Sequence, residues 1–379
     1  MKKRISTFLT MFLLVFLLGV NVCADSGVNV YADSDVNVYA DSPVAQIGSK
    51  KYTSLEKAFS AVKKGQTITL IKNTTINGDL KIKLGKKSAT LNLNKKKLTV
   101  KGSFNLYSGT LAISGNGNLT TKQINNAGAL ILKNGTVNGS VVNSGKFVMH
   151  NGTLNYSKNL MYAIYAKGGT VTINKGTVNY KRHFVSYEEG NNVPEKTNGA
   201  AIIATGKSKV IVNGGKIVSS SETIMTKEDC KANIILNNGT FQSTNGGCIA
   251  HIGGNITING GNYSIKGAWG FAYVYGSCTL NIKGGNIKSQ WSLVETYSER
   301  SNANISGGTL NTTISGRSGQ PAMLIAFDGK INVTGGKFIA KNKPYAYWRN
   351  PNGAGSIKVS KKVKMPTPNL WKETDDVCA

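Results

Sequence analysis

Apolar residues recur in one short pattern along most of the chain. Ten glycines anchor the copies, and the positions five and three residues before each anchor and two residues after it are always apolar. The residue between the first two apolar positions is mostly polar, which is the spacing of a strand with one buried face. The repeat therefore predicts short β-strands. The anchors are Gly109, Gly135, Gly152, Gly176, Gly215, Gly239, Gly261, Gly285, Gly308 and Gly336.

The repeat length indicates how these strands are assembled. The anchors recur about every 23 residues, and a further apolar run precedes the anchor, as at 201–204, 249–252, 272–275 and 322–327. A single coil of this length cannot bury its apolar side chains, whereas stacked coils bury a continuous column. We therefore predict an all-β parallel β-helix (solenoid) of about ten coils. A β-sandwich or a propeller fits less well, because propeller blades need about 40 residues each.

A short helix is predicted ahead of the coils. Thr53 and Glu56 have the spacing of a capping box, and apolar residues recur after them at helical spacing. Such an N-terminal capping helix would cover the open end of the column. The apolar set is Leu55, Ala58, Phe59 and Val62. We divide the chain into a basic N-terminal cap and first coils (44–101), β-helix repeats (102–342), and a C-terminal cap and tail (343–379).

Several motifs resemble a known superfamily. They are Asn-Ile-Thr-Ile-Asn-Gly-Gly-Asn-Tyr at 255–263, Lys-Ile-Asn-Val-Thr-Gly-Gly-Lys-Phe at 330–338, and the entry segments 45–59 and 65–71. With them, residues 45–360 resemble the pectate-lyase-like superfamily of right-handed parallel β-helices, in particular its secreted Gram-positive surface members. The resemblance implies a right-handed coil. It leaves the activity open, because the superfamily includes lyases, hydrolases and adhesins.

The N-terminus has the pattern of an export signal. Basic residues at 2–4 precede an apolar stretch at 8–20 and a Val-Cys-Ala sequence ending at Ala24. This order is typical of a secretory signal peptide, here 1–24, and the apolar stretch is shorter than the roughly 20 residues that span a bilayer. Residues 25–43 form a leader of repeated octapeptides that offers further Val-x-Ala cleavage sites at Ala32 and Ala40. We expect a secreted, extracellular protein without a membrane span that can associate with the cell surface.

The charge of the chain points to anionic partners. The formal net charge is +28, and 14 lysines lie between Lys50 and Lys101 against two acids, Glu56 and Asp79. Such a surface attracts polyanions, among them acidic polysaccharide and teichoic acid, whereas export disfavours nucleic acid. The alternative is that the lysines only solubilise the rod and protect its strand edges.

Candidate catalytic groups are few. Catalysis on polysaccharides needs clustered carboxylates, and the eleven acids in the body of the chain form no such cluster in the sequence. The longest interval between anchors holds an insertion in which bases and acids adjoin, and loops on rigid scaffolds often carry sites. An insertion with incidental charges is the alternative. The loop candidates are Lys181, Arg182, His183, Glu188 and Glu189.

Aromatic residues form a second candidate site. They alternate along one strand and recur near the next coil and near the C-terminal cap, where exposed rings could contact sugars. Internal packing is the alternative explanation. The candidate ligand-binding residues are Trp269, Tyr273, Tyr275, Trp291, Tyr347 and Trp348.

The cysteines leave several possibilities open. After cleavage at Ala24 four remain, and they allow three pairings or free buried thiols. None has Cys-x-x-Cys spacing, so we expect no metal site and no cofactor. The four are Cys230, Cys248, Cys278 and Cys378.

These features together favour a binding protein. We expect a monomeric secreted or cell-surface β-helix that binds acidic or neutral polysaccharide or anionic wall polymer, in adhesion or envelope attachment. The alternative is a divergent polysaccharide lyase or glycoside hydrolase, which the scarcity of acids disfavours.

Overall fold

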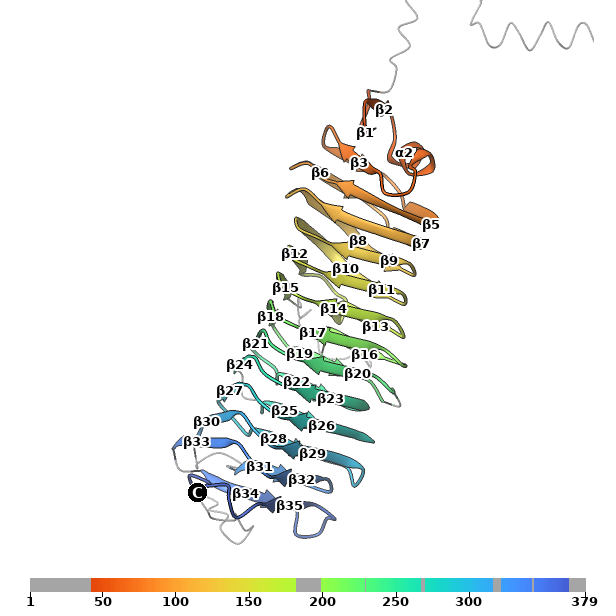
Figure 1. The fold of residues 1–379 in the computed structure, drawn as a ribbon. Helices are drawn as coiled ribbons and strands as arrows, with labels where there is room; N and C mark the ends of the chain where they lie inside the picture. The colour runs from red at the N-terminus through yellow and green to blue at the C-terminus, as the bar shows by residue number, and fades with distance from the viewer. Residues whose placement is uncertain are drawn as a thin grey trace, which may run out of the picture. The chain divides into compact units, whose positions relative to one another are not determined.

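The structure is a computed structural model (Figure 1) that describes residues 42–181, 199–228, 230–266, 270–315, 322–342 and 344–367. From Pro43 onward the chain forms one compact unit. It is an all-β parallel solenoid of about 11 turns, as the repeat predicts. The predicted signal peptide and residues 25–41 of the leader lie outside the described residues.

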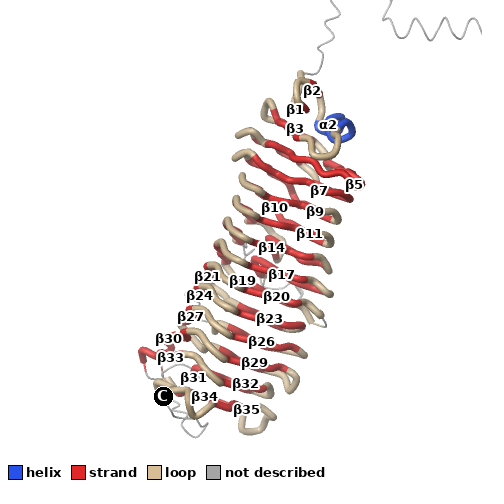
Figure 2. The backbone as a smooth tube through the Cα atoms, in the orientation of Figure 1, coloured by secondary structure: helices blue, strands red, loops and turns tan. Residues whose placement is uncertain are grey.

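Each complete turn contributes strands to three faces, along which successive turns pair in parallel. Figure 2 shows these strands joined by short turns. The first face consists of β3 (Thr67–Leu70), β5 (Leu80–Asn92), β7 (Phe104–Ser114), β9 (Ala129–Leu132), β11 (Lys146–Met149), β14 (Thr170–Ile173), β17 (Lys209–Val212), β20 (Asn233–Leu236), β23 (Gly254–Ile258), β26 (Cys278–Ile282), β29 (Ser301–Ile305), β32 (Lys330–Val333) and β35 (Ser356–Val359).

The second face follows the first after one corner of the coil. It consists of β4 (Thr74–Ile76), β6 (Lys97–Val100), β8 (Asn118–Asn126), β10 (Thr136–Asn143), β12 (Thr153–Tyr156), β15 (Thr177–Tyr180), β18 (Lys216–Ser219), β21 (Thr240–Ser243), β24 (Asn262–Ile265), β27 (Asn286–Ser289), β30 (Thr309–Ser315) and β33 (Lys337–Asn342).

The third face completes the turn and contains the apolar runs predicted ahead of the anchors. Its early turns use one end of β5, β7, β8 and β10. Its later strands are β13 (Tyr162–Lys167), β16 (Ala200–Thr205), β19 (Glu222–Thr226), β22 (Ile249–His251), β25 (Ala272–Val274), β28 (Val294–Thr296), β31 (Ala322–Ala326) and β34 (Tyr345–Arg349).

The predicted apolar positions form the core. All thirty are buried, and the most exposed of them, Phe338, has 6% of its surface accessible. The first copy is nevertheless out of register with the others. Leu111 pairs with Leu130 and Leu119 pairs with Val137, so the glycine that corresponds to Gly135 is Gly117 rather than Gly109. All three faces repeat the same alternation of apolar and polar residues. The first copy of the pattern was therefore aligned on a glycine at a different corner of the coil.

Both ends of the column differ from its middle. At the N-terminal end, β1 (Ala45–Ile47) pairs antiparallel with β2 (Lys50–Tyr52) and with β3, and the predicted helix is α2 (Leu55–Ala61). Its N-cap is Ser54, whose hydroxyl accepts from the Lys57 amide, one residue beyond the predicted Thr53. At the other end, β34 and β35 continue the parallel stacking into the segment that we expected as a cap.

Asparagine side chains reinforce one corner of the stack. The amide of Asn213 donates to Asn174 at 2.9 Å, that of Asn237 donates to Asn213 at 2.8 Å, and that of Asn259 donates to Asn237 at 2.8 Å. Each asparagine side chain is therefore hydrogen-bonded to the asparagine on the next turn. These outward-facing asparagines of the repeat therefore have a structural role.

The corners also restrict side-chain size. Two glycines at neighbouring corners show separately the effect of a positive φ and the effect of a close backbone contact. Gly176 (φ +93°) would place a Cβ 2.4 Å from the Gly152 carbonyl oxygen, whereas a Cβ on Gly168 (φ +83°) would meet nothing within 4 Å. We predict that Gly168→Ala costs about 1 kcal/mol from backbone strain. We predict that Gly176→Ala costs about 1 to 3 kcal/mol more from the added clash. Denaturation midpoints check this, and equal costs would contradict the close stacking of the corners.

Candidate functional site

An aromatic ladder follows the third face where the chain turns toward the first face. Tyr275, Tyr297 and Phe327 come directly after β25, β28 and β31. The ring centroids of Tyr275 and Tyr297 are 4.4 Å apart, and those of Tyr297 and Phe327 are 4.5 Å apart, with nearly parallel planes. We call the corner between the third and first faces the ladder corner.

The ladder connects three of the predicted ligand-binding residues. Tyr273 and Tyr275 stack at 6.4 Å, and Trp348 meets Phe327 edge-on at 4.9 Å. Within the ladder, Tyr297 has a neighbouring ring on both faces, so a sugar could meet only its edge and hydroxyl. The internal-packing explanation therefore accounts for most of this ring surface.

A buried carboxyl group adjoins the ladder. The hydroxyl of Tyr297 donates to Glu295 Oε2 at 2.5 Å, and the hydroxyl of Ser292 donates to Glu295 Oε1. Burial raises the pKa of Glu295, although these two hydrogen bonds act in the opposite direction. Burial, and next the charge of Glu295, also raises the pKa of Tyr273.

A second acid lies near the same tyrosines. The Glu222 carboxyl, 3% exposed, is close enough that its charge contributes to the raised pKa of both Tyr273 and Tyr275. Glu222 and Glu295 are 73 residues apart in the chain, and Tyr273 pairs directly with Glu295 between β25 and β28. This cluster cannot be found from the sequence, because nothing in the repeat marks which turns hold the acids.

Glycines leave room for the cluster. A Cβ on Gly247 would lie 2.8 Å from the Tyr273 ring, and a Cβ on Gly270 would lie 3.0 Å from Glu295 Oε1. Larger residues at these positions would displace the ring or the carboxyl group. The acid–tyrosine cluster (Glu222, Tyr273, Tyr275, Glu295 and Tyr297) is thus closely packed.

The predicted catalytic loop is only partly described. Lys181 is exposed just after β15 and lines a shallow pocket with Asn155 and Asn179. The aromatic candidate Trp269 lies outside the described residues, and so do the other loop candidates. They are Arg182, His183, Glu188 and Glu189. Their catalytic role stays a prediction.

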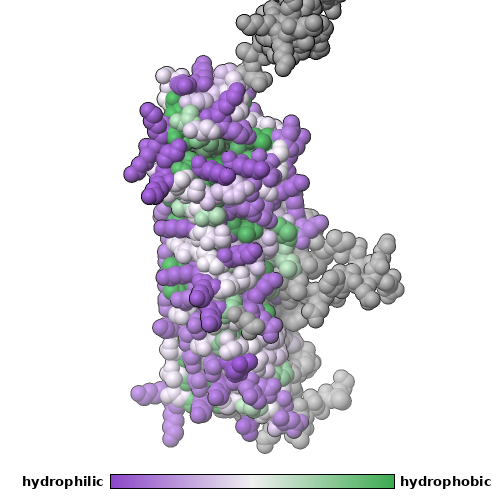
Figure 3. All heavy atoms as spheres, turned by 90° about the vertical axis from the view of Figure 1, so that its right-hand side faces the viewer, coloured by the Kyte–Doolittle hydropathy of each residue, from purple (hydrophilic) through white to green (hydrophobic). Residues whose placement is uncertain are grey.

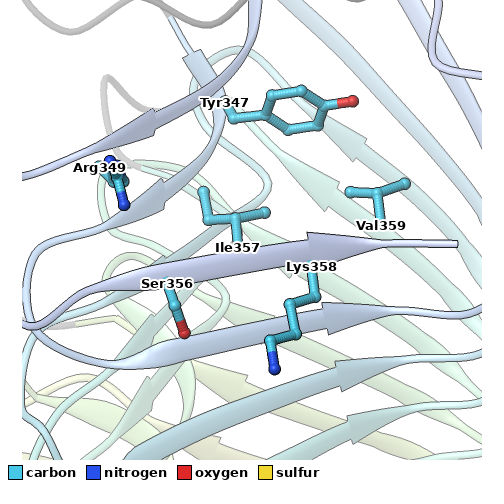
Figure 4. Close-up of a pocket in the computed structure, with 6 residues that line it drawn as sticks. All are labelled: Tyr347, Arg349, Ser356, Ile357, Lys358 and Val359. Atoms are coloured by element: carbon cyan, nitrogen blue, oxygen red, sulfur yellow. The ribbon is translucent and has the colours of Figure 1, made fainter.

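The remaining aromatic candidates are separated from one another. Trp291 is half-buried in the turn between β27 and β28. Tyr347 lies on the inner side of β34, and Figure 4 shows it projecting over Ile357 and Val359 at the end of the column. Trp348 is 3% exposed and packs with Ile325 on the outer side of the same strand. Adjacent in sequence, Tyr347 and Trp348 therefore point to opposite sides of their strand.

The N-terminal turns carry a strongly basic surface. Residues 42–181 hold 21 lysines and two acids, and most of these lysines are exposed. Figure 3 shows hydrophilic side chains crowded over the N-terminal turns on one side of the molecule. Tyr107 is 47% exposed, and Lys83 Nζ lies 5.6 Å from its ring centroid. We call this region the basic surface.

Three cysteines and a histidine lie buried in the middle turns. Cys230, Cys248 and Cys278 are free thiols, while Cys378 lies outside the described residues. Burial is the main cause that raises the pKa of Cys248 and Cys278 to about 12, which disfavours their reactive thiolates. His251 is fully buried, with ring nitrogens 3.0 Å from Thr226 Oγ1 and 3.1 Å from the Thr279 carbonyl oxygen.

The described residues contain neither a cluster of metal-ligating side chains nor a helix able to span a membrane. Within them, no three His, Cys, Asp or Glu side chains are grouped so as to hold a metal ion. In the same part of the chain, α2 is the single helix, and no helix has the length and hydrophobicity needed to cross a membrane.

Comparison with known proteins adds no family. No protein-family model, no curated protein and no solved structure matches this chain.

The buried histidine predicts how stability depends on pH. Burial lowers the pKa of His251 from an ordinary 6.5 to about 4. As the pH falls through this interval, the unfolded chain binds a proton that the folded chain excludes. Unfolding should therefore become easier by up to about 3 kcal/mol.

Denaturation midpoints between pH 6.5 and 4 measure this effect. We expect His251→Gln to flatten the pH dependence of the denaturation midpoint. The comparison also separates His251 from Glu295, whose raised pKa acts in the opposite sense. An unchanged slope in His251→Gln would refute the assignment.

Proposed function

We propose that this protein is a secreted or cell-surface solenoid that binds anionic polymer, such as acidic polysaccharide or teichoic acid, in adhesion or envelope attachment. The basic surface carries the proposal, with 21 lysines and two acids over residues 42–181. The signal-peptide pattern and the resemblance to secreted pectate-lyase-like surface proteins support export.

The distribution of the charge suits a polymer better than a small ligand. The lysines lie on successive turns of a rigid column, at roughly 4.8 Å per turn, so an extended chain could meet several at once. Each exposed contact is weak by itself in salt, but together they attract a polyanion and hold it. Tyr107 adds an exposed ring within this surface, where a sugar could stack.

The basic surface can be tested by removing charge from it alone. We predict that a variant with Lys81, Lys83, Lys86 and Lys101 changed to Gln binds teichoic acid at least about tenfold more weakly, with a smaller dependence on salt. Binding isotherms at two salt concentrations measure both quantities.

The matched control removes the same charge from the C-terminal turns. Lys283, Lys288, Lys330 and Lys337 are also exposed, and their change to Gln should have a small effect. Equal losses in the two variants would indicate attraction by net charge only. Absence of binding by the unaltered protein to any anionic polymer would refute the proposal.

A second function, polysaccharide lyase or glycoside hydrolase, is favoured by the acid–tyrosine cluster. A carboxyl group with a raised pKa can act as a general acid, and a neighbouring carboxylate or tyrosine can act as the general base. This arrangement answers the main objection from the sequence, which is the scattering of the acids.

The enzymatic alternative predicts a residue-specific loss of turnover. New reducing ends or unsaturated sugar ends should form from a polysaccharide, and Glu295→Gln should lower the rate at least about 100-fold. Glu299→Gln, at an exposed position in the tight turn that follows β28, should not change the rate. Equal turnover in Glu295→Gln and the unaltered protein would exclude this cluster as the catalytic site.

A further inference from the structure

A polar groove lies on the ladder corner, beside the aromatic rings. It spans four turns at the point where the chain passes from the third face to the first face. Lys231, Ser277 and Arg300 line it just before β20, β26 and β29, together with Asn255, Thr279 and Asn302 at the start of the first face. Its volume is about 490 Å³.

The register places cations at both ends of the groove. The pairing of Gly254 with Cys278 and of Cys278 with Ser301 aligns Gly253, Ser277 and Arg300 on successive turns. The pairing of Asn233 with Asn255 aligns Lys231 with Gly253. Lys231 and Arg300 are therefore three turns apart, roughly 14 Å along the axis, with two small residues between them.

These cations are available to a ligand. Both are exposed, and among the described residues neither forms a salt bridge with an acid. Glu299 precedes Arg300 in the sequence but does not line the groove. Ser277 and Asn255 are also exposed and can donate hydrogen bonds to an oxygen placed between the two charges.

Hydrogen bonds to the backbone fix the side chains on the floor of the groove. The thiol of Cys278, 5% exposed, donates to the Tyr275 carbonyl oxygen at 2.7 Å, and that of Cys230, 7% exposed, donates to the Gly253 carbonyl oxygen at 3.3 Å. On the rim, the Asn302 amide donates to the Arg300 carbonyl oxygen at 3.2 Å. The turns that carry the cations are thus held in place before any ligand binds.

We propose that this groove is a binding subsite for an oxyanion group, a carboxylate or a phosphate, carried by an extended polymer, an inference that rests on the proposed binding of anionic polymer. Arginine suits such groups because its planar guanidinium can donate two parallel hydrogen bonds, and lysine supplies a second positive charge. The groove is on other turns than the basic surface. It would therefore select a particular anionic group where the basic surface supplies general attraction.

The experiment uses the full chain and a matched pair of probes. One is a hexameric oligouronate, and the other is its methyl ester, in which the carboxylates are neutral. We expect the oligouronate to bind and the ester to bind at least about tenfold more weakly. Lys231→Gln/Arg300→Gln should lower oligouronate affinity about tenfold and leave the ester unaffected.

The controls separate the groove from net charge. Lys283→Gln/Lys330→Gln removes two exposed charges from neighbouring turns outside the groove and should leave oligouronate affinity unchanged. Equal binding of acid and ester, or equal losses in the two double variants, would overturn the proposal. Melting temperatures identify a variant that fails to fold, and Arg300→Lys, which keeps the charge, should then recover part of the affinity.

Two further arms identify the source of the oxyanion. Inorganic phosphate and an oligo(glycerol phosphate) are tested against the same variants. Groove-dependent binding of the oligomer supports a phosphate carried by a polymer. Groove-dependent binding of free phosphate alone would overturn the proposal that the ligand is a polymer. The variant lacking basic-surface lysines should still distinguish oligouronate from its ester, so a failure of the basic surface and a failure of the groove give different results.

Discussion

The parallel pairing of each turn with the turns before and after it is the constraint on which this structure depends. Every complete coil must present inward apolar residues on three faces in the same register as its neighbours, since a slip of one residue would turn them outward. The backbone oxygens of one turn lie so close to the corner glycines of the next that Gly176 has no room for a Cβ. Apolar alternation and small corners are therefore required together.

This constraint divides the chain into positions governed by packing and positions free to vary. Inward residues and tight corners belong to the first group, and exposed corner residues belong to the second. The N-terminal turns use this freedom for lysine, and the later turns use it for the ladder and the adjoining groove. Recognition by such a protein is therefore best sought in how its turns differ from one another.

The acid–tyrosine cluster illustrates the energetic side of this division. Glu295 is 4% exposed on the outer side of the third face, where an isolated carboxylate would be costly. Ser292 and Tyr297 supply hydrogen bonds, and burial keeps the pKa of the acid raised. The hydrogen bonds thus come from residues that flank β28 on the same turn, while pairing with β25 and β31 on the neighbouring turns helps to bury the group.

The solenoid, its core and its basic end follow from the sequence alone, because apolar spacing and composition are local properties that can be counted. Ser54 as the N-cap and the register of the Gly109 copy were decided by tertiary structure, since several residues satisfied the same local pattern. Tertiary structure also decided that Glu222 and Glu295 approach the same tyrosines and that Lys231 and Arg300 bound one groove. These contacts depend on how many residues each coil contains, and irregular corners change that number from turn to turn.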